Sequence, residues 1–425
     1  MRSDLTSDQP PTSKVHYAPT RLDHRIYLDH AATTPPDPAV IESMIPYLTT
    51  HWHNPSSIYV EAQHTRRAID QARTTVAHHI GATPDEIIFT SGGSESDTLA
   101  VRGVLAATRS LGKHLITSAI EHHAVLDTVE QLQRDGLADV TLITPGPDGQ
   151  IDPTSVAAAV RADTVLVSVM HANNELGALN DIAAIAQQVR EVNPRTLIHT
   201  DAVQTVAHLG IHVNRLGIDL LTFTAHKLYG PRGVGALYVR NGTPLQPQII
   251  GGGQEDRRRA GTENTPAIVG FATALELAAD RREADLIHER TLQQQLIDEL
   301  PKLIPISTIA GPRDLTNRLP GNVSALIGFV EGESILVALD LAGIAASSGS
   351  ACTTGSVEPS HVLTAIGIPD DLARGSLRFS FGRGNTTEDV DHLLQTLPPI
   401  VQRLRELSPL PTTEPPPTWL PWLST

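Results

Sequence analysis

The feature of this sequence that most limits its fold is a regular alternation of strand-like and helix-like segments between residues 86 and 239. Short runs rich in β-branched residues recur along this stretch, and helical patterns such as 181–192 lie between several of them. This alternation predicts an α/β domain in which helices cover both faces of a mainly parallel sheet. Ligands bind such sheets at the carboxyl ends of the strands. The predicted strands are, in chain order, EIIFT, HLITS, DVTLIT, TVLVSVM, TLIHT, DLLTFTA and VGALYV.

The pattern changes beyond Gly270. A long helical run, roughly 266–300, precedes a stretch punctuated by Pro and Gly that contains the strand-like segments NVSALIGF and SLRFSFG. A final helix is expected near 387–407, and together these elements predict a second, smaller α+β domain. We therefore expect a polar, flexible arm (1–25), a large domain (37–280), a small domain (26–36 with 281–408) and a Pro/Trp-rich tail (409–425).

The tail carries Trp419 and Trp422 among several prolines. A Pro-rich end resists folding on its own, although it can dock as an extended segment. We expect a disordered end here, with contact to a partner as the alternative.

Composition argues against several classes of function. The chain of 425 residues has 32 Lys plus Arg against 47 Asp plus Glu, and its net charge of -15 argues against direct binding of nucleic acid. Neither an export signal nor an apolar run long enough to span a membrane is visible. The single cysteine, Cys352, excludes an intrachain disulfide and any Cys-rich metal site, so we expect a reducing, cytoplasmic environment. The histidines lack a metal-ligand spacing such as HExxH, and we expect no metal.

One segment has the properties of a phosphate site. After the predicted strand EIIFT, the small and hydroxyl residues of SGGSES (91–96) lead into an apolar-periodic helix. Free backbone N–H groups at a helix start bind anions, and small residues let the anion approach. The spacing matches neither GxGxxG nor a Walker P-loop, so nucleotide binding is not expected. The alternative is an ordinary glycine turn with a serine cap.

A carboxylate and an amine follow two neighbouring predicted strands. Asp201 comes after TLIHT, and Lys227, one of only four lysines, comes after DLLTFTA. Both side chains would therefore reach the same edge of the sheet. A cofactor that needs a Schiff-base lysine, an acidic partner for a ring nitrogen and a phosphate cradle is pyridoxal phosphate. The alternatives are that Asp201 caps a helix and that Lys227 lies in a simple Gly-Pro turn.

Several segments in a fixed order make the chain resemble the cysteine desulfurases of the NifS/IscS type, in the aminotransferase class V group. The resemblance implies a fold-type I pyridoxal phosphate enzyme with a large, mainly parallel seven-stranded sheet domain and a smaller α+β domain. The segments are YLDHAATTPP, NPSS, FTSGGSESDTLA, EHHAVLDT, HANNELG, HTDAVQT, TAHKLYGPRGVGALYVR, RAGTEN, SSGSACTTGSVEPSHVL and SLRFSFGR.

The resemblance assigns roles around the cofactor ring. It implies that Lys227 forms the Schiff base with pyridoxal 5'-phosphate and that Asp201 pairs with the ring nitrogen. His122 would stack on the ring and assist proton transfer. Asn174 and Gln204 would contact the phenolic oxygen of the ring.

A second group of residues would hold the phosphate. The resemblance places Gly93, Ser94, Thr224 and His226 on this side, and it brings Thr262 from the other subunit of a homodimer. The chain has Gly93-Ser94 where Ala-Thr is common in the family, and Thr224 where Ser is usual. Each change keeps a hydroxyl, so we expect the reaction class to be the same.

The resemblance also implies the reaction. Arg378, with Asn174, would bind the carboxylate of L-cysteine, for which a planar guanidinium is suited. Cys352 lies in a segment rich in Gly and hydroxyl residues, and its thiolate would take the sulfur as a persulfide and leave L-alanine. The sulfur would then pass to an acceptor protein, either an iron–sulfur scaffold or a tRNA-thiolation enzyme. The alternatives are a selenocysteine lyase, which needs no protein thiol, and a non-catalytic scaffold that retains the fold.

Overall fold

The computed structural model describes residues 25–348, 359–407 and 415–423. Its largest element is a seven-stranded sheet with the order β2-β8-β7-β6-β5-β3-β4, in which only β8 runs antiparallel to its neighbours. The predicted α/β fold with a mainly parallel sheet is confirmed, and every predicted strand of this sheet forms. The strands are β2 (Ile87–Thr90), β3 (His114–Ser118), β4 (Asp139–Ile143), β5 (Thr164–Ser168), β6 (Leu197–Asp201), β7 (Leu220–Thr224) and β8 (Gly235–Val239).

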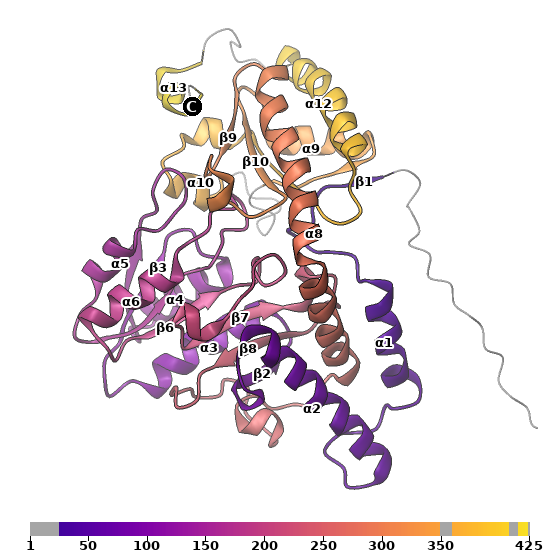
Figure 1. Cartoon of the computed structure of the whole chain (residues 1–425). Helices are drawn as coiled ribbons and strands as arrows, with labels where there is room; N and C mark the ends of the chain where they lie inside the picture. Colours follow the sequence, from indigo (N-terminus) through magenta and orange to yellow (C-terminus); the bar gives the residue numbers. More distant parts are fainter. Residues whose placement is uncertain (1–24, 349–358, 408–414, 424–425) are drawn as a thin grey trace, which may run out of the picture.

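Helices cover both faces of this sheet, because its strands carry apolar side chains on both faces. Ile87 and Phe89 of β2 pack into one core, whereas Ile88 between them packs into another. Helices α3 and α4 pack against the second core, whereas α1, α2, α5, α6 and α7 pack against the first (Figure 1). The helices are α1 (Pro38–Thr49), α2 (Val60–Ile80), α3 (Gly93–Ala107), α4 (His123–Arg134), α5 (Pro153–Ala159), α6 (Ile182–Val192) and α7 (Val213–Leu216).

A 39-residue helix, α8 (Thr265–Leu303), joins the large sheet to a smaller one (Figure 1). Its first half packs on α1 and α2, and its second half supplies Leu292 and Leu296 to a separate core. The smaller sheet is antiparallel with the order β12-β10-β9, and the sequence predicted two of its three strands. Its elements are β9 (Ser307–Ala310), β10 (Asn322–Ile327), α9 (Gly332–Leu341), β12 (Ser376–Ser380) and α12 (Thr387–Leu407).

The first described residues pass from the small sheet to the large one. Strand β1 (Ile26–Tyr27) pairs in parallel with β11 (Ile344–Ala345), and Asp29 then bridges to Ser380 of β12. This path carries the backbone of residues 31 and 32 to the carboxyl edge of the large sheet. The proposed division of the chain at residue 280 falls inside α8 and stays a prediction.

The C-terminal segment differs from the sequence-based expectation. A disordered end is wrong for residues 415–423, because Trp419 is 2% exposed and its ring lies 4.9 Å from that of Phe329. Its indole Nε1 donates a hydrogen bond of 2.9 Å to Asp371. Gly328 makes room for the ring, since a Cβ there would lie 2.5 Å from Trp419. The short helices of this region are α10 (His361–Ala365), α11 (Asp370–Ala373) and α13 (Leu420–Leu423).

We predict that Trp419→Ala lowers the free energy of unfolding by about 3 kcal/mol, because it removes a buried ring and leaves a cavity. Trp419→Phe keeps the aromatic contact with Phe329 and should cost about 1 kcal/mol, the value of the lost hydrogen bond. Urea unfolding followed by circular dichroism measures both. The control is Leu341→Ala, because Leu341 is 85% exposed. A Trp419→Ala variant as stable as this control would contradict the docked position of the segment.

Candidate functional site

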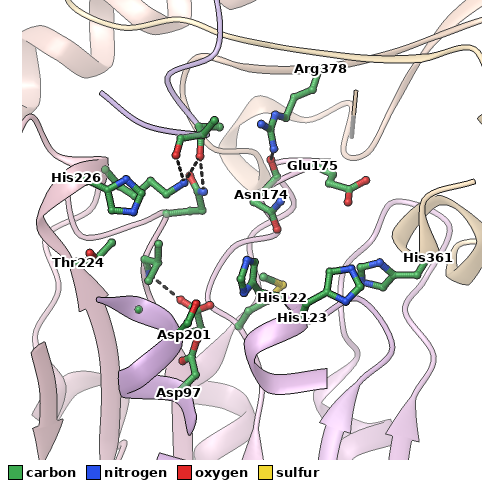
Figure 2. Close-up of a pocket in the computed structure, with 18 residues that line it drawn as sticks. Asp97, His122, His123, Asn174, Glu175, Asp201, Thr224, His226, His361 and Arg378 are labelled. Atoms are coloured by element: carbon green, nitrogen blue, oxygen red, sulfur yellow. Dashed lines mark hydrogen bonds between the residues drawn. The ribbon is translucent and has the colours of Figure 1, made fainter. Parts of the chain in front are cut away.

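A cavity of about 340 Å³ lies at the carboxyl edge of the large sheet, below the small one (Figure 2). Residues from β6, β7, the starts of α3 and α4, and β12 line it. The structure therefore brings together almost all of the predicted site residues. Those that line the cavity are Gly93, Ser94, His122, Asn174, Asp201, Gln204, Thr224, His226, Lys227 and Arg378.

Two predicted residues are not part of this lining. Thr262 is exposed on the surface and does not line the cavity of its own chain. Cys352 lies outside the described residues. The ends of the chain on either side of it are described: Ser347 pairs with Arg378 through backbone hydrogen bonds, and His361 lines the cavity.

The start of α3 provides an anion site. Gly92 is its N-cap residue and gives no side-chain hydrogen bond to the first turn, so the serine cap considered from the sequence is not formed. The first N–H groups of this 15-residue helix therefore point to the cavity edge without a side-chain partner. A Cβ on Gly93 would lie 2.9 Å from Val203, which keeps this position small.

Asp201 ends β6 and is 5% exposed. Its Oδ1 accepts a hydrogen bond of 2.8 Å from the amide of Val203 in the turn that follows, and it caps no helix. Burial raises the pKa of this carboxyl to about 6, against the opposing effects of the Val203 amide and of Lys227. The charge of Lys227 thus favours an ionised carboxylate in a site that water barely reaches.

Lys227 follows β7 in a single 3₁₀ turn, and its amine lies on the same side of the sheet as Asp201. Its Nζ donates hydrogen bonds to the backbone carbonyls of Ala31 and Ala32, the latter at 2.7 Å. These carbonyls come from the segment that β1 brings across from the small sheet. The amine is therefore held at the boundary between the two sheets.

A second acid, Asp97, lies beneath Asp201 and was not predicted from the sequence. It is 1% exposed, and burial together with the charge of Asp201 raises its pKa well above the usual value. His199 Nε2 lies 3.7 Å from Asp97 Oδ1, and burial lowers the pKa of this histidine to about 3. The shift favours the neutral form of Asp97 and so leaves the negative charge preferentially to Asp201. The sequence carried no distinguishing signal, because Asp97 is one of two acidic residues near the start of α3.

His122 both caps α4 and lines the cavity. Its Nδ1 accepts a hydrogen bond of 3.1 Å from the amide of Ala124, so the neutral ring carries its proton on Nε2. Burial and the nearby Lys227 lower its pKa to about 4. One ring therefore both caps α4 and lines the cavity.

Three further predicted residues already have partners among the chain's own groups. Thr224 Oγ1 donates 2.9 Å to the carbonyl of Val234, and Gln204 Nε2 donates 3.0 Å to the carbonyl of Ala31. His226 Nδ1 lies 3.2 Å from the hydroxyl of Thr33. Burial and then Lys227 lower the pKa of His226 to about 4, so its ring is neutral at pH 7. Because the hydroxyl hydrogen of Thr224 is donated to Val234, its oxygen can act only as an acceptor toward a further group.

Arg378 reaches the cavity from β12 of the small sheet (Figure 2). It is 2% exposed, and its Nη2 donates 2.9 Å to Asp29. Its Nη1 donates 3.3 Å to the carbonyl of Asn174, while its buried Nε has no hydrogen-bond partner. The guanidinium is thus fixed in direction and retains a donor for a further anion.

Sequence reasoning missed three side chains on the remaining wall, His123, Glu175 and His361. Each lies within a segment that carries the family resemblance, but none of the three was assigned a role from the sequence. Burial raises the pKa of Glu175 above its usual value. Within the described ranges, no cluster of His, Cys, Asp and Glu has the arrangement of a metal site.

The comparisons with known proteins agree with this geometry. The model of the family described as "Aminotransferase class-V" matches residues 26–393. The chain belongs to the aminotransferase class V family. A relative from Dictyoglomus turgidum named "Cysteine desulfurase IscS" is 46% identical, and the match covers 91% of this chain and 97% of the relative.

Several solved structures have the same fold. A "NIFS-LIKE PROTEIN" superposes with a TM-score of 0.84 at 34% identity, covering 89% of this chain and 100% of the other. A structure described as "SspA in complex with cysteine" superposes with a TM-score of 0.72 at 38% identity, covering 84% and 99%. Within the part of this chain that the structure places, no helix has both the length and the apolar composition for crossing a bilayer.

Enzymes of this class depend on pyridoxal phosphate, and the residues of the cavity fit this group. The fit rests on three observations made above: a lysine amine at the cavity, a buried carboxylate on the same edge of the sheet, and a helix start without a side-chain cap. The amine suits the aldehyde, the carboxylate suits a protonated ring nitrogen, and the helix start suits a phosphate.

We predict that the affinity of the protein for the cofactor depends on the protonation state of Asp201. As the pH falls through about 6, the pKa of Asp201, the carboxyl takes up a proton and no longer pairs with a protonated ring nitrogen. The dissociation constant of the wild type should therefore rise about fivefold more between pH 6 and pH 5 than that of Asp201→Asn. Absorbance titration of cofactor-free protein measures both.

The matched control is Asp97→Asn. This variant changes the neighbouring buried carboxyl but keeps Asp201, so its dissociation constant should still rise more below pH 6 than that of Asp201→Asn. Equal slopes in the wild type and in Asp201→Asn would contradict the assignment of Asp201.

Proposed function

We propose that this protein is a cysteine desulfurase, which converts L-cysteine to L-alanine and transfers the sulfur to Cys352 as a persulfide. The observation that carries the proposal is the meeting of Lys227, the buried Asp201 and Arg378 in one cavity. The name of the Dictyoglomus relative and the cysteine complex of a structural neighbour support the choice of substrate.

The chain's own residues hold the cofactor in this proposal. Gly93 and Ser94 at the start of α3, with Thr224 and His226, surround the phosphate. Asp201 pairs with the ring nitrogen, His122 covers the ring, and Asn174 and Gln204 contact the phenolic oxygen. When bound, the cofactor stores the electron pair that the substrate releases at Cα.

The remaining residues act on the substrate. Arg378 binds the carboxylate of L-cysteine, and its ion pair with Asp29 fixes the direction of the guanidinium. Lys227 Nζ takes the proton from Cα, since it is the amine at the cavity. The sulfur of Cys352 attacks the sulfur of the substrate, and the product leaves as L-alanine.

We predict that Lys227→Ala lowers alanine formation from L-cysteine by at least about 1000-fold, because both the covalent link to the cofactor and the base are lost. Cys352→Ala should retain the cofactor but form no persulfide. Alanine release and mass spectrometry of the protein measure these outcomes.

Full sulfur transfer by Cys352→Ala would contradict the desulfurase proposal. A variant that instead keeps its activity on selenocysteine but not on cysteine would favour the selenocysteine lyase. The control is Lys302→Ala, because Lys302 is an exposed lysine on α8 that pairs only with Glu299 among the described residues.

A homodimer is part of the proposal, with Thr262 reaching the phosphate of the partner's site. Two segments that contact the neighbours of Thr262 in the sequence have exposed apolar side chains in or next to them. Ile58 and Ile250 are 95% and 84% exposed, and the backbone beside Ile250 bonds to Ala260. On the other side, Glu263 forms an ion pair of 3.0 Å with Arg66 of α2. Exposed apolar surface of this kind marks protein interfaces when it is contiguous, and the proposed homodimer would cover both side chains.

We predict that the double change Ile58→Asp and Ile250→Asp converts the dimer to a monomer, because charges would enter an apolar interface. Sedimentation velocity measures the mass. Cofactor affinity should fall as well, since Thr262 of the second subunit would be lost. Leu341→Asp on α9, 85% exposed but far along the chain, is the control. A chain that is monomeric before mutation would contradict this part of the proposal.

The destination of the sulfur and the compartment also belong to the proposal. An acceptor protein, either an iron–sulfur scaffold or a tRNA-thiolation enzyme, receives the persulfide sulfur. The single cysteine supports a reducing compartment such as the cytoplasm, in which a free thiol persists.

A further inference from the structure

Three consecutive residues in the connection between β8 and α8 have an unusual backbone. Glu255, Asp256 and Arg257 have φ values of 47°, 53° and 64°, in the left-handed region that residues other than glycine rarely adopt. A run of such residues persists only where the surrounding structure imposes it, and backbone strain of this kind clusters at functional sites. None of the three lines the cavity. The strained turn therefore has a cause outside the cavity.

The side chain of Glu255 anchors this turn to the large sheet. Glu255 is 6% exposed, and each of its carboxylate oxygens accepts a hydrogen bond of 2.7 Å from the guanidinium of Arg73 on α2. Its Oε2 also accepts a hydrogen bond of 2.9 Å from the amide of Phe89 on β2, the edge strand of the sheet. A bidentate pair fixes direction as well as distance. The carboxylate thus holds the strained turn against a helix and a strand.

The anchored turn belongs to a closed loop (249–261) that ends beside Thr262. The neck of the loop is closed by a hydrogen bond of 3.2 Å from the amide of Ala260 to the carbonyl of the first loop residue. Gln254, next to the anchor, accepts a hydrogen bond of 3.1 Å from the amide of Gly261 through its Oε1. The backbone immediately before Thr262 is therefore tied to the anchored turn.

The backbone after Thr262 is held as well. Glu263 is 8% exposed and accepts a hydrogen bond of 3.0 Å from Arg66 of α2. Asn264 is the N-cap of α8 and accepts a hydrogen bond of 3.3 Å from the amide of Ala267. Thr262 itself is exposed between these fixed points and does not line the cavity of its own chain. Such a position suits contact with a second copy of the chain.

We propose that Glu255 is a positioning residue for the cofactor site of the other subunit. Its contacts with Arg73 and β2 hold the loop 249–261 so that Thr262 reaches the phosphate in that site. This inference rests on the proposed function and its homodimer. Glu255 contacts neither cofactor nor substrate, and it acts through the place that it gives to Thr262. Its loss weakens cofactor binding in the opposite subunit and leaves the site of its own chain intact.

The test compares two mixed dimers that contain the same two substitutions. Glu255→Gln keeps the length of the side chain but replaces one acceptor oxygen by an amide NH2, which cannot accept from Arg73 or Phe89. Lys227→Ala removes the amine that binds the cofactor covalently, so one site in each dimer gives the absorbance of the lysine-bound cofactor. The substitutions lie on the same chain in one dimer and on different chains in the other. Two purification tags select each mixed dimer.

We expect the dissociation constant of the cofactor to rise about tenfold when the substitutions share a chain, because a hydrogen bond to a charged phosphate is displaced. When they lie on different chains, it should equal that of a mixed dimer carrying Lys227→Ala alone. Absorbance titration of the cofactor-free dimers measures both. Asp256→Asn in place of Glu255→Gln is the matched control, because Asp256 lies in the same turn but its side chain is 84% exposed. It should leave the affinity unchanged in either arrangement.

A second variant, Arg73→Lys, tests the same contact from α2. Lysine keeps the charge but loses the bidentate pair, so it should give the same pattern with a smaller rise. Weaker binding only when the substitutions lie on different chains, equal weakening in both arrangements, or no weakening in either would overturn the proposal. A wild type that sediments as a monomer would contradict the homodimer and this inference with it. A dimeric wild type that forms no alanine from L-cysteine would instead contradict the desulfurase activity.

Discussion

The site depends on keeping one carboxylate charged where water barely reaches. Asp201 is buried at the end of a parallel strand, and burial alone would neutralise it. The fold opposes this with the Val203 amide and the amine of Lys227, and burial together with the charge of Asp201 raises the pKa of the neighbouring Asp97. A cofactor with a protonated ring nitrogen would complete the balance of charge. The carboxyl edge of the sheet is where these groups can converge, because β6 and β7 run in the same direction.

The two sheets contribute different chemistry to the cavity. The large sheet supplies the amine, the carboxylate and the uncapped helix start, all of which suit the cofactor. The polypeptide beyond α8 supplies Arg378, whose guanidinium suits the carboxylate of an amino acid.

Much of this arrangement could be predicted from the sequence, because the features have local signals. β-branched runs predicted the strands of the large sheet, and the residues after β6 and β7 predicted Asp201 and Lys227. Strand β9 was missed because STIA is only four residues long. Asp97 was missed because its environment depends on a partner distant in the chain, Asp201. The docking of Trp419 was missed because its contacts, Gly328, Phe329 and Asp371, are distant from it in the chain.

The long helix α8 limits how the two sheets can move. Between residues 271 and 300 it contains neither glycine nor proline, the usual origins of a kink. At about 1.5 Å per residue, its 39 residues form a rod of about 58 Å. A rigid rod shared by both sheets acts as a lever, so a movement of one sheet relative to the other would have to come from tilting the whole helix or from its flanking connections.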